Sequence, residues 1–439
     1  MSIFKACDIR GVYPDQLDSE TARRVGRALG AEMTGLSCLL GGDVRPSTPE
    51  LKAAVAEGLV ASGVRVTDVG HAPTPALHWA RAHLEMEAVV IITASHNPPE
   101  YNGIKFAFGE RPPTPEVVDR IERRVEEEDF VDARGKLQER EIRDDYLGWL
   151  ARHFDGKGTG MRVLIDAGNG AAAGWAAPAF RSVGCEVEEL HCTPDGTFPE
   201  RSPNPAVPEA LRDTCRVVAE RGVDFGVAFD GDGDRAVFVD ETGQYVESDQ
   251  SVILLARNAL RRQPGGTVIY DQKCSQHVGQ EITRAGGRPV RERSGYAFIK
   301  NRLLDEGAIF AGEASGHFFF REVGGDDAIY AGLRMAAILQ EAGEPLSTLL
   351  NTIPDYHISP DIRLPRPAGD AQTVIEHLKD CFSERPQDYT DGVRIQFDDG
   401  WALCRESVTE PVITLRFEGD TPEALERIKG RVMDEIPEP

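Results

Sequence analysis

The sequence of 439 residues has no long apolar run and no closely paired cysteines. A membrane-spanning helix needs about 18 consecutive apolar residues, and runs such as residues 88–92 are far shorter. The eight cysteines include no CxxC pair, and the opening residues MSIFK do not begin a secretory signal. We therefore expect reduced thiols, a cytoplasmic location and no membrane partner.

Positive charge is also scarce. The chain has 49 Lys and Arg against 73 Asp and Glu, which gives a net charge of −24. Nucleic acid phosphates and anionic lipid headgroups repel such a chain, so neither is an expected partner. A site for an anionic substrate would need a local cluster of cations. The candidates are Lys5, Arg10, Lys105, Arg235, Lys273, Arg288, Arg405 and Arg416.

The length and composition predict a folded chain of several domains, with 41% hydrophobic and 28% charged residues. Strand-like runs alternate with amphipathic stretches over roughly the first 350 residues, which is typical of layered α/β domains. Polar and proline-rich stretches place α/β domains at 1–142, 143–245 and 246–356. The remaining residues, 357–439, predict an α+β domain with strands at 393–397 and 412–417 and a helix from Pro422.

Three buried-type strands lead directly into polar or glycine-rich loops. Residues 88–92 precede TASHNP, residues 225–229 precede DGDGDR, and residues 308–311 precede GEASGH. In α/β sheets, ligands bind at the carboxyl ends of the strands. We therefore expect each α/β domain to contribute one loop to a common site.

The second loop carries three aspartates at alternate positions. In an extended segment Asp230, Asp232 and Asp234 point the same way, and the intervening glycines let the backbone curl around an ion. This pattern favours a hard divalent cation over a solvated turn. An EF-hand is the other metal-binding candidate, because Glu241 stands at its twelfth position, but Arg235 replaces the glycine of its sixth.

The first loop places the Ser95 hydroxyl beside His96 at a strand end, where a cation could activate it or hold its phosphate. Such a Ser-His pair, taken alone, is more often a simple turn. Lys105 follows in NGIKF as a candidate general base, if burial lowers its pKa, or as a charge-stabilising group. A solvated lysine fits equally well.

The third loop and a C-terminal loop offer groups that bind sugars and phosphates. Glu313 and Ser315 can bind vicinal sugar hydroxyls, and His317 is either a proton donor or a buried, satisfied histidine. The segment RESVTEP, which starts at Arg405, combines with Arg416 as in phosphate-binding loops, although a surface loop is an equal alternative.

Together these motifs resemble the α-D-phosphohexomutases, specifically the bacterial phosphomannomutase/phosphoglucomutase branch. The resemblance runs along nearly the whole chain and includes FKACDIRG from Phe4, the Ser95 loop, DAGNG from Asp166, the Asp230 loop, GEASGH and the Arg405 loop. It implies three similar mixed-sheet α/β/α domains and a C-terminal α+β domain with a TATA-binding-protein-like fold, all around a central cleft.

The resemblance also implies the chemistry. Ser95 is expected to be a phosphoserine whose phosphate binds one Mg²⁺ together with Asp230, Asp232 and Asp234. It would exchange phosphoryl groups with a hexose 1- or 6-phosphate through a hexose 1,6-bisphosphate that turns around in the cleft, with glucose 1,6-bisphosphate as activator. The catalytic residues implied besides Ser95 are Lys105, His317, Arg10 and His96. The substrate-binding residues implied are Glu313, Ser315, Arg235, Lys273, Gly295, Tyr296, Arg405, Ser407, Thr409 and Arg416.

Three positions depart from the family pattern: Cys7 stands where Tyr is usual, Tyr296 where His is common and Val408 where Asn is usual. Mannose and glucose phosphates are the favoured substrates, because GEAS lacks the Gln typical of phosphoglucosamine mutases. The alternatives are a phosphoglucosamine mutase, a metal-dependent sugar phosphatase and a non-catalytic sugar-phosphate-binding protein. A monomer and a dimer are both compatible with the sequence.

Overall fold

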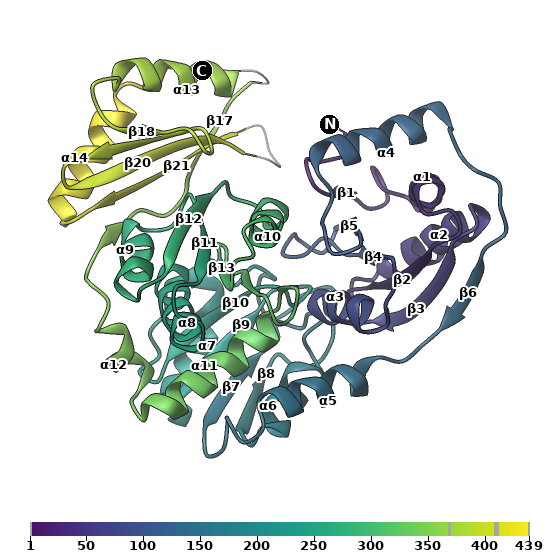
Figure 1. The fold of residues 1–439 in the computed structure, drawn as a ribbon, viewed down its shortest axis with the longest axis horizontal. Coiled ribbons are helices and arrows are strands. Elements are labelled where there is room, and N and C mark those ends of the chain that lie inside the picture. The colour runs from purple at the N-terminus through teal and green to yellow at the C-terminus, as the bar shows by residue number, and fades with distance from the viewer. Residues whose placement is uncertain (1, 368–369, 408–411, 438–439) are drawn as a thin grey trace.

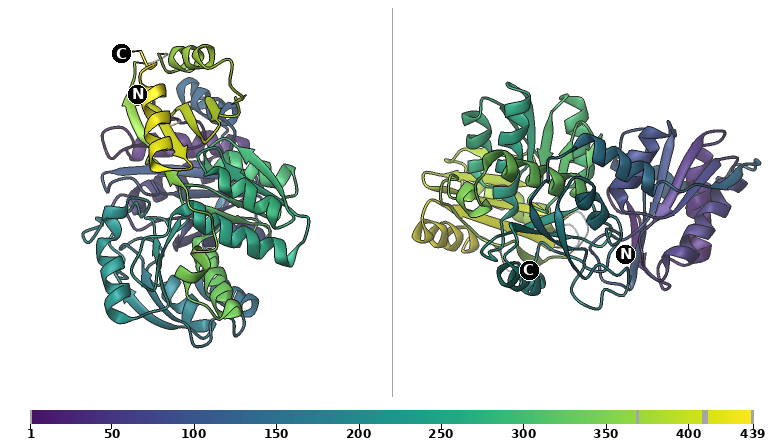
Figure 2. Two further views of the ribbon diagram at one scale, coloured as in Figure 1. Left: turned by 90° about the vertical axis from the view of Figure 1, so that its left-hand side faces the viewer. Right: turned by 90° about the horizontal axis from the view of Figure 1, so that it is seen from below.

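The computed structural model describes residues 2–367, 370–407 and 412–437. These residues form four sheets with flanking helices (Figures 1 and 2). In Figure 1 the first and last units lie on opposite sides at the top, and the second and third units join them below. Among the described residues, no helix combines the length and the apolar character that a bilayer span requires.

The first unit is a six-stranded mixed sheet of order β1-β5-β4-β2-β3-β6. Every residue of β4 is buried, as expected of a central strand covered on both faces. The predicted strand at 88–92 is therefore confirmed. The elements are β1 (Ile9–Val12), α1 (Ser19–Glu32), β2 (Ser37–Gly42), α2 (Thr48–Ala61), β3 (Arg65–His71), α3 (Thr74–His83), β4 (Ala88–Ile92), β5 (Tyr101–Phe108), α4 (Pro115–Glu127) and β6 (Lys136–Glu139).

The second unit has a four-stranded mixed sheet of order β10-β9-β7-β8, in which only β10 runs antiparallel to its neighbour. The predicted strand at 225–229 is confirmed as β9. The elements are α5 (Arg143–His153), β7 (Arg162–Asp166), α6 (Ala176–Ser182), β8 (Glu186–Leu190), the 3₁₀ helix η1 (Pro208–Leu211), α7 (Arg212–Arg221), β9 (Phe225–Phe229) and β10 (Ala236–Asp240).

The third unit has a five-stranded mixed sheet of order β12-β11-β13-β14-β15. The strand expected at 308–311 lies at 310–312 as β13. The elements are α8 (Ser248–Arg262), β11 (Thr267–Asp271), α9 (Gln276–Arg284), β12 (Arg288–Glu292), α10 (Tyr296–Asp305), β13 (Phe310–Gly312), β14 (Phe318–Phe320), β15 (Gly325–Asp326), α11 (Ala328–Ala342) and α12 (Leu346–Leu350).

The described residues of the fourth unit form an antiparallel sheet with two helices, as the α+β prediction required. Strands at 393–397 and from 412, and the helix from Pro422, are confirmed. The elements are β16 (His357–Ile358), β17 (Ile362–Pro365), α13 (Asp370–Cys381), β18 (Gln387–Asp388), β19 (Val393–Phe397), β20 (Gly400–Glu406), β21 (Val412–Gly419) and α14 (Pro422–Met433).

The apolar cores show which units are packed together. One cluster contains Trp79 of α3, Tyr146 of α5, Phe225 of β9 and Phe318 of β14, so it joins the first three units. The fourth unit has a separate core that includes Leu378, Phe417 and Ile428. Three α/β units thus share buried apolar surface, whereas the fourth packs around its own core.

Candidate active site

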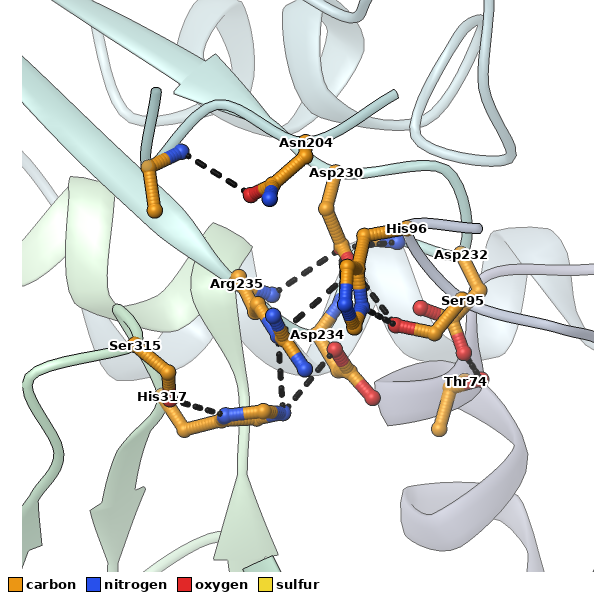
Figure 3. A network of polar contacts seen from close by, with 12 residues as sticks. Thr74, Ser95, His96, Asn204, Asp230, Asp232, Asp234, Arg235, Ser315 and His317 are labelled. Carbon is orange, nitrogen blue, oxygen red and sulfur yellow. Dashed lines mark hydrogen bonds and ion pairs between the residues drawn. The ribbon is translucent and has the colours of Figure 1, made fainter. Parts of the chain in front are cut away.

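The loop after β4 holds Ser95 in a left-handed backbone conformation, with φ of 52°. Its side chain is buried, and its Oγ donates a 2.8 Å hydrogen bond to Asp230 Oδ2 (Figure 3). The Ser95 amide donates to Thr93 Oγ1, and His96 Nδ1 lies 3.3 Å from Ser95 Oγ. Strained non-glycine residues of this kind cluster at functional sites. The loop directs the Ser95 hydroxyl at the aspartates of the second unit.

A buried ion pair that sequence reasoning missed supports this loop. Asp43 and Arg45 directly follow β2, and Arg45 Nε donates to Asp43 Oδ2 at 3.0 Å with both side chains fully buried. The other guanidinium nitrogens donate to the carbonyl oxygens of Ser95, Asn97, Pro98 and Tyr101. A signal for this pair was present, because residues 37–42 are one more strand that ends in a polar loop, DVRPS.

The loop after β9 brings three carboxylates together. One oxygen from each of Asp230, Asp232 and Asp234 lies within 4.8 Å of the others. Asp230 Oδ1 accepts hydrogen bonds from the backbone N–H groups of Gly233, Asp234 and Arg235, which closes the turn. At Gly231 a Cβ would lie 2.4 Å from the Ser95 carbonyl oxygen, so only glycine allows the two loops to approach this closely.

The aspartate cluster concentrates negative charge. Asp232 Oδ1 is buried and accepts no hydrogen bond from any described residue. Burial and the neighbouring Asp234 and Asp232 carboxylates raise the pKa of Asp230 well above its ordinary value. Buried anions are costly unless a cation compensates them, and carboxylate oxygens are the preferred ligands of Mg²⁺. The donor set therefore fits a hard divalent cation.

The same loop does not have the ligand arrangement of an EF-hand. Glu241 at the twelfth position accepts a 3.2 Å hydrogen bond from the Ser347 amide. It does not belong to the carboxylate cluster found among the described residues. Strands β9 and β10 flank the loop, whereas helices flank an EF-hand loop.

Lys105 on β5 brings one positive charge to the aspartates. Its Nζ lies 2.8 Å from Asp232 Oδ2 and 2.6 Å from Asp234 Oδ2, and Thr74 Oγ1 also donates to Asp232 Oδ2. Burial alone would lower the pKa of Lys105, but the two carboxylates raise it well above its ordinary value. In this arrangement Lys105 is an ammonium group that offsets carboxylate charge. A general base would need a lowered pKa, and Lys105 does not have one.

The loop after β13 forms a connected set of polar groups. Glu313 Oε2 accepts a 2.6 Å hydrogen bond from Ser315 Oγ and lies 3.0 Å from His317 Nδ1. His317 Nε2 lies 3.2 Å from Asp234 Oδ1, so this loop meets the aspartate loop (Figure 3). Burial would lower the pKa of His317, but Asp234 and Glu313 raise it to about 10. His317 is therefore an imidazolium in this arrangement.

A cavity of about 250 Å³ lies where residues from all four units meet. Twelve of the residues proposed from the sequence line it, namely Lys5, Arg10, His96, Arg235, Lys273, Gly295, Tyr296, Glu313, Ser315, His317, Arg405 and Ser407. Arg363, which was not predicted, adds positive charge to its wall. Ser95 and Lys105 are not part of the lining and are buried at the aspartates.

Not every expected residue reaches this cavity. The expectation that Arg288 belongs to the cation cluster is wrong, because it is exposed on β12 and pairs with Glu306. Arg416 does not line the cavity, and its Nη2 lies 3.5 Å from Asp249 Oδ2. Thr409 and Val408 lie outside the described residues.

Three cations of the cavity pair with nearby carboxylates. Arg10 pairs with Asp8 at 2.6 Å, and Lys273 pairs with Asp361 at 2.9 Å. Arg405 Nε donates to Asp391 Oδ2 at 2.5 Å, while its buried Nη2 donates to no described residue. A buried guanidinium nitrogen without an acceptor can bind an anionic ligand.

Family models cover most of the chain. Phosphoglucomutase/phosphomannomutase α/β/α domains I, II and III match residues 1–132, 145–243 and 247–356, and the C-terminal domain matches 362–435. The chain therefore belongs to the phosphoglucomutase/phosphomannomutase family, and the predicted family and fold class are confirmed.

Individual relatives are similar over their full length. The chain is 39% identical over 435 residues to a phosphomannomutase/phosphoglucomutase of Pseudomonas aeruginosa, covering 98% of this chain and 94% of the relative. It is 38% identical over 442 residues to a phosphoglucomutase of Neisseria meningitidis, covering 98% and 95%. A crystal structure of a family protein from Burkholderia thailandensis matches with a TM-score of 0.92 at 35% identity, covering 99% of this chain and 96% of that one.

Proposed function

We propose that this protein is a phosphohexomutase that interconverts the 1- and 6-phosphates of mannose and glucose. The observation that carries this proposal is the 2.8 Å hydrogen bond from Ser95 to Asp230, which places a hydroxyl at three buried carboxylates beside a cation-lined cavity. Relatives that cover nearly the whole chain bear the names phosphomannomutase/phosphoglucomutase and phosphoglucomutase, which supports both substrates.

In the proposed reaction Ser95 carries a phosphoryl group. A free hydroxyl of the hexose phosphate attacks phosphorus, the bond from phosphorus to Ser95 Oγ breaks, and the hydroxyl proton is transferred so that Ser95 is left as a serine hydroxyl. The product is a hexose 1,6-bisphosphate. After this intermediate turns around, the other phosphate returns to Ser95 by the reverse step, so that no phosphate is consumed.

The hexose 1,6-bisphosphate must reorient in the cavity because the site has a single phosphoryl-carrying serine, Ser95, at a fixed position. Both ends of the sugar must reach Ser95 in succession, while the phosphate that is not reacting needs a second binding place. Arg405 and Lys273, from the fourth and third units, are the proposed ligands for that phosphate. Glu313 and Ser315 would bind sugar hydroxyls in both orientations.

Geometry distinguishes the two candidates for proton transfer. His317 lines the cavity, whereas Lys105 is buried at the aspartates. The His317 imidazolium is therefore the proposed proton donor of the cavity, and Lys105 is assigned electrostatic support of the aspartates. Arg10, His96, Arg235, Gly295, Tyr296 and Ser407 complete the proposed binding surface, because each lines the same cavity.

The proposal includes Mg²⁺, held by Asp230, Asp232, Asp234 and the phosphate on Ser95. When bound, the ion would neutralise charge on the transferred phosphoryl group. Glucose 1,6-bisphosphate is the proposed activator, because it can phosphorylate Ser95 directly. We also place the enzyme in the cytoplasm, since none of its eight cysteines forms a disulfide.

The test is turnover of mannose 1-phosphate, glucose 1-phosphate and glucosamine 1-phosphate to their 6-phosphates, with Mg²⁺ and a trace of glucose 1,6-bisphosphate. We expect conversion of the mannose and glucose compounds by the native chain and none by Ser95→Ala. Preference for glucosamine 1-phosphate would support a phosphoglucosamine mutase instead. Release of inorganic phosphate without isomerisation would support a phosphatase, and binding without turnover would support a non-catalytic protein.

A further inference from the structure

A second cavity, of about 280 Å³, lies between the first and third units and shares no lining residue with the catalytic cavity. His78 and Arg81 of α3 line one side. Lys300 of α10 and Arg321, which follows β14, line the other. The labels α3 and α10 mark these helices near the centre of Figure 1.

Lys300 is the most unusual residue of this cavity. It is 3% exposed, and its ammonium group makes no hydrogen bond or ion pair with any residue that the structure describes. Burial lowers the pKa of Lys300, the Asp326 and Glu110 carboxylates partly offset that effect, and the Arg81 guanidinium adds to it. Lysines are almost never buried without a partner, so the site is short of negative charge.

The two arginines of the cavity are also without carboxylate partners among the described residues. Arg81 Nη1 donates to the Met86 carbonyl oxygen at 3.2 Å, and Arg321 Nη1 donates to the Gly307 carbonyl oxygen at 3.2 Å. Each guanidinium therefore keeps N–H groups for another acceptor. Arg81 is itself partly buried, and desolvation lowers its pKa, with Glu110 opposing that effect.

The balance of charge around the cavity is the reverse of that of the whole chain. Three cations and His78 face one lining carboxylate, that of the exposed Glu110. Burial and the neighbouring Lys300, Lys105 and Arg81 lower the pKa of His78 well below its ordinary value, so it is a neutral imidazole. In a chain with a net charge of −24, such a pocket concentrates anions.

We propose that this cavity binds a phosphate dianion, either inorganic phosphate or the phosphate group of a small metabolite, through Lys300, Arg81 and Arg321. Guanidinium groups bind phosphate oxygens in pairs, and a lysine acts as a point charge on the same group. The wall also includes Leu303, Leu304 and Ala308, which leave room for an apolar part of a phosphorylated ligand.

The two helices connect this site to the catalytic one. Thr74 at the start of α3 donates to Asp232, and Tyr296 at the start of α10 lines the catalytic cavity. His78 and Lys300 stand four residues later on the same helices, one turn away and on the same face. An anion bound between α3 and α10 would fix the distance between the first and third units. Because it binds only the folded chain, it would also raise the free energy of unfolding.

The test is calorimetric titration of inorganic phosphate into a chain carrying Lys273→Ala and Arg405→Ala, which weaken binding in the catalytic cavity. We expect phosphate still to bind, and Lys300→Met on this background to weaken it about 10-fold or more, because a charge-assisted hydrogen bond is lost. Arg321→Gln at an exposed position is a second variant with little risk to folding and should weaken binding in the same direction.

Arg134→Gln is the matched control, because Arg134 is exposed and does not line the cavity. Absence of phosphate binding in the background chain would overturn the proposal, and so would equal affinity in the background, Lys300→Met and Arg321→Gln chains. Titration of glucose 6-phosphate into the background and Lys300→Met chains separates the two ligand sources. Binding that Lys300→Met weakens and that is tighter than that of inorganic phosphate identifies a phosphorylated metabolite, and weaker binding identifies free phosphate. None of these readouts depends on mutase activity.

Discussion

The Tyr296 hydroxyl of the third unit donates a 3.2 Å hydrogen bond to the Cys7 carbonyl oxygen of the first unit. Both residues line the catalytic cavity, and the ring of Tyr296 lies 5.5 Å from Lys105 Nζ. Burial and the nearby Asp8 carboxylate raise the pKa of Tyr296 well above its ordinary value, so its hydroxyl remains a donor. The two positions that depart from the family pattern in the described part of the chain are thus in contact.

Tyr296→Phe should weaken substrate binding more than chemistry. The variant keeps the ring but loses the link between the first and third units, and a hydrogen bond of this kind contributes about 1 kcal/mol. We expect KM for glucose 1-phosphate to rise about 5-fold with kcat retained. Tyr389→Phe is the control, because Tyr389 is 60% exposed. Equal KM values for Tyr296→Phe and the native chain would contradict this role.

The strands that lead into the site could be predicted because they are buried on both faces and therefore apolar without interruption. β4 and β9 lie at the predicted residues. β13 starts two residues late, since the Ala308 amide donates to the Leu303 carbonyl oxygen and so completes the turn that ends α10. An apolar run in the sequence does not show which of its residues belong to the turn that ends the preceding helix and which belong to the strand.

The site residues divide in a similar way. The Asp230 loop could be found from its own spacing, whereas the Ser95 loop could be found only in combination with the other motifs. The loop DVRPS could be found as a polar strand end, but the role of Arg45 could not be assigned, because four of its five side-chain acceptors are backbone carbonyl oxygens, which leave no pattern in the sequence. Arg288 was misassigned because its partner Glu306 is brought near only by the fold. The domain boundaries at 142, 245 and 356 and the roles of the site residues stay predictions.

Removal of divalent metal should stop turnover, and Mg²⁺ should restore it. Asp232→Asn deletes one anionic ligand, so we expect the Mg²⁺ concentration for half-maximal activity to rise about 10-fold or more. Metal titration of EDTA-treated protein measures this. Glu241→Gln is the control, because Glu241 binds Ser347 instead of the cluster. A larger shift for Glu241→Gln than for Asp232→Asn would favour the EF-hand arrangement.

Arg405→Ala should weaken substrate binding while Ser95 still accepts a phosphoryl group. Arg405 lines the cavity from the fourth unit and has a buried nitrogen without an acceptor among the described residues, whereas Ser95 and the aspartates are untouched. We expect KM to rise about 10-fold or more, as for the loss of one charge-assisted hydrogen bond. Mass spectrometry after treatment with glucose 1,6-bisphosphate detects the phosphoserine.

The control for Arg405→Ala is Arg427→Ala in the same unit, because the Arg427 side chain is 54% exposed and pairs with Asp399. This variant should keep the native KM. An unchanged KM for every hexose phosphate in Arg405→Ala would remove Arg405 from the binding surface, and loss of the phosphoserine would show that Arg405 is needed for the transfer itself.

Asp327 should make stability depend on pH near neutrality. It is fully buried at the N-terminus of α11, where it accepts hydrogen bonds from Tyr146 Oη at 2.7 Å and from the Tyr330 amide at 2.8 Å. Burial raises its pKa to about 7, against about 4 in an unfolded chain. Because the folded state holds this proton more tightly, the contribution to stability is complete below about pH 4 and is lost as pH rises through about 7.

Asp327→Asn keeps an oxygen acceptor in a side chain that never ionises, so it should remove this dependence. We expect the variant to gain about 2 kcal/mol in unfolding free energy over the native chain between pH 5 and pH 8, measured by urea unfolding at each pH. Asp18→Asn is the control, because Asp18 caps α1 at an exposed position and hydrogen bonds from Thr21 lower its pKa. Its ionisation is complete by pH 5, so the difference between that variant and the native chain should stay constant from pH 5 to pH 8. A constant difference for Asp327→Asn as well would show that Asp327 does not titrate in this range.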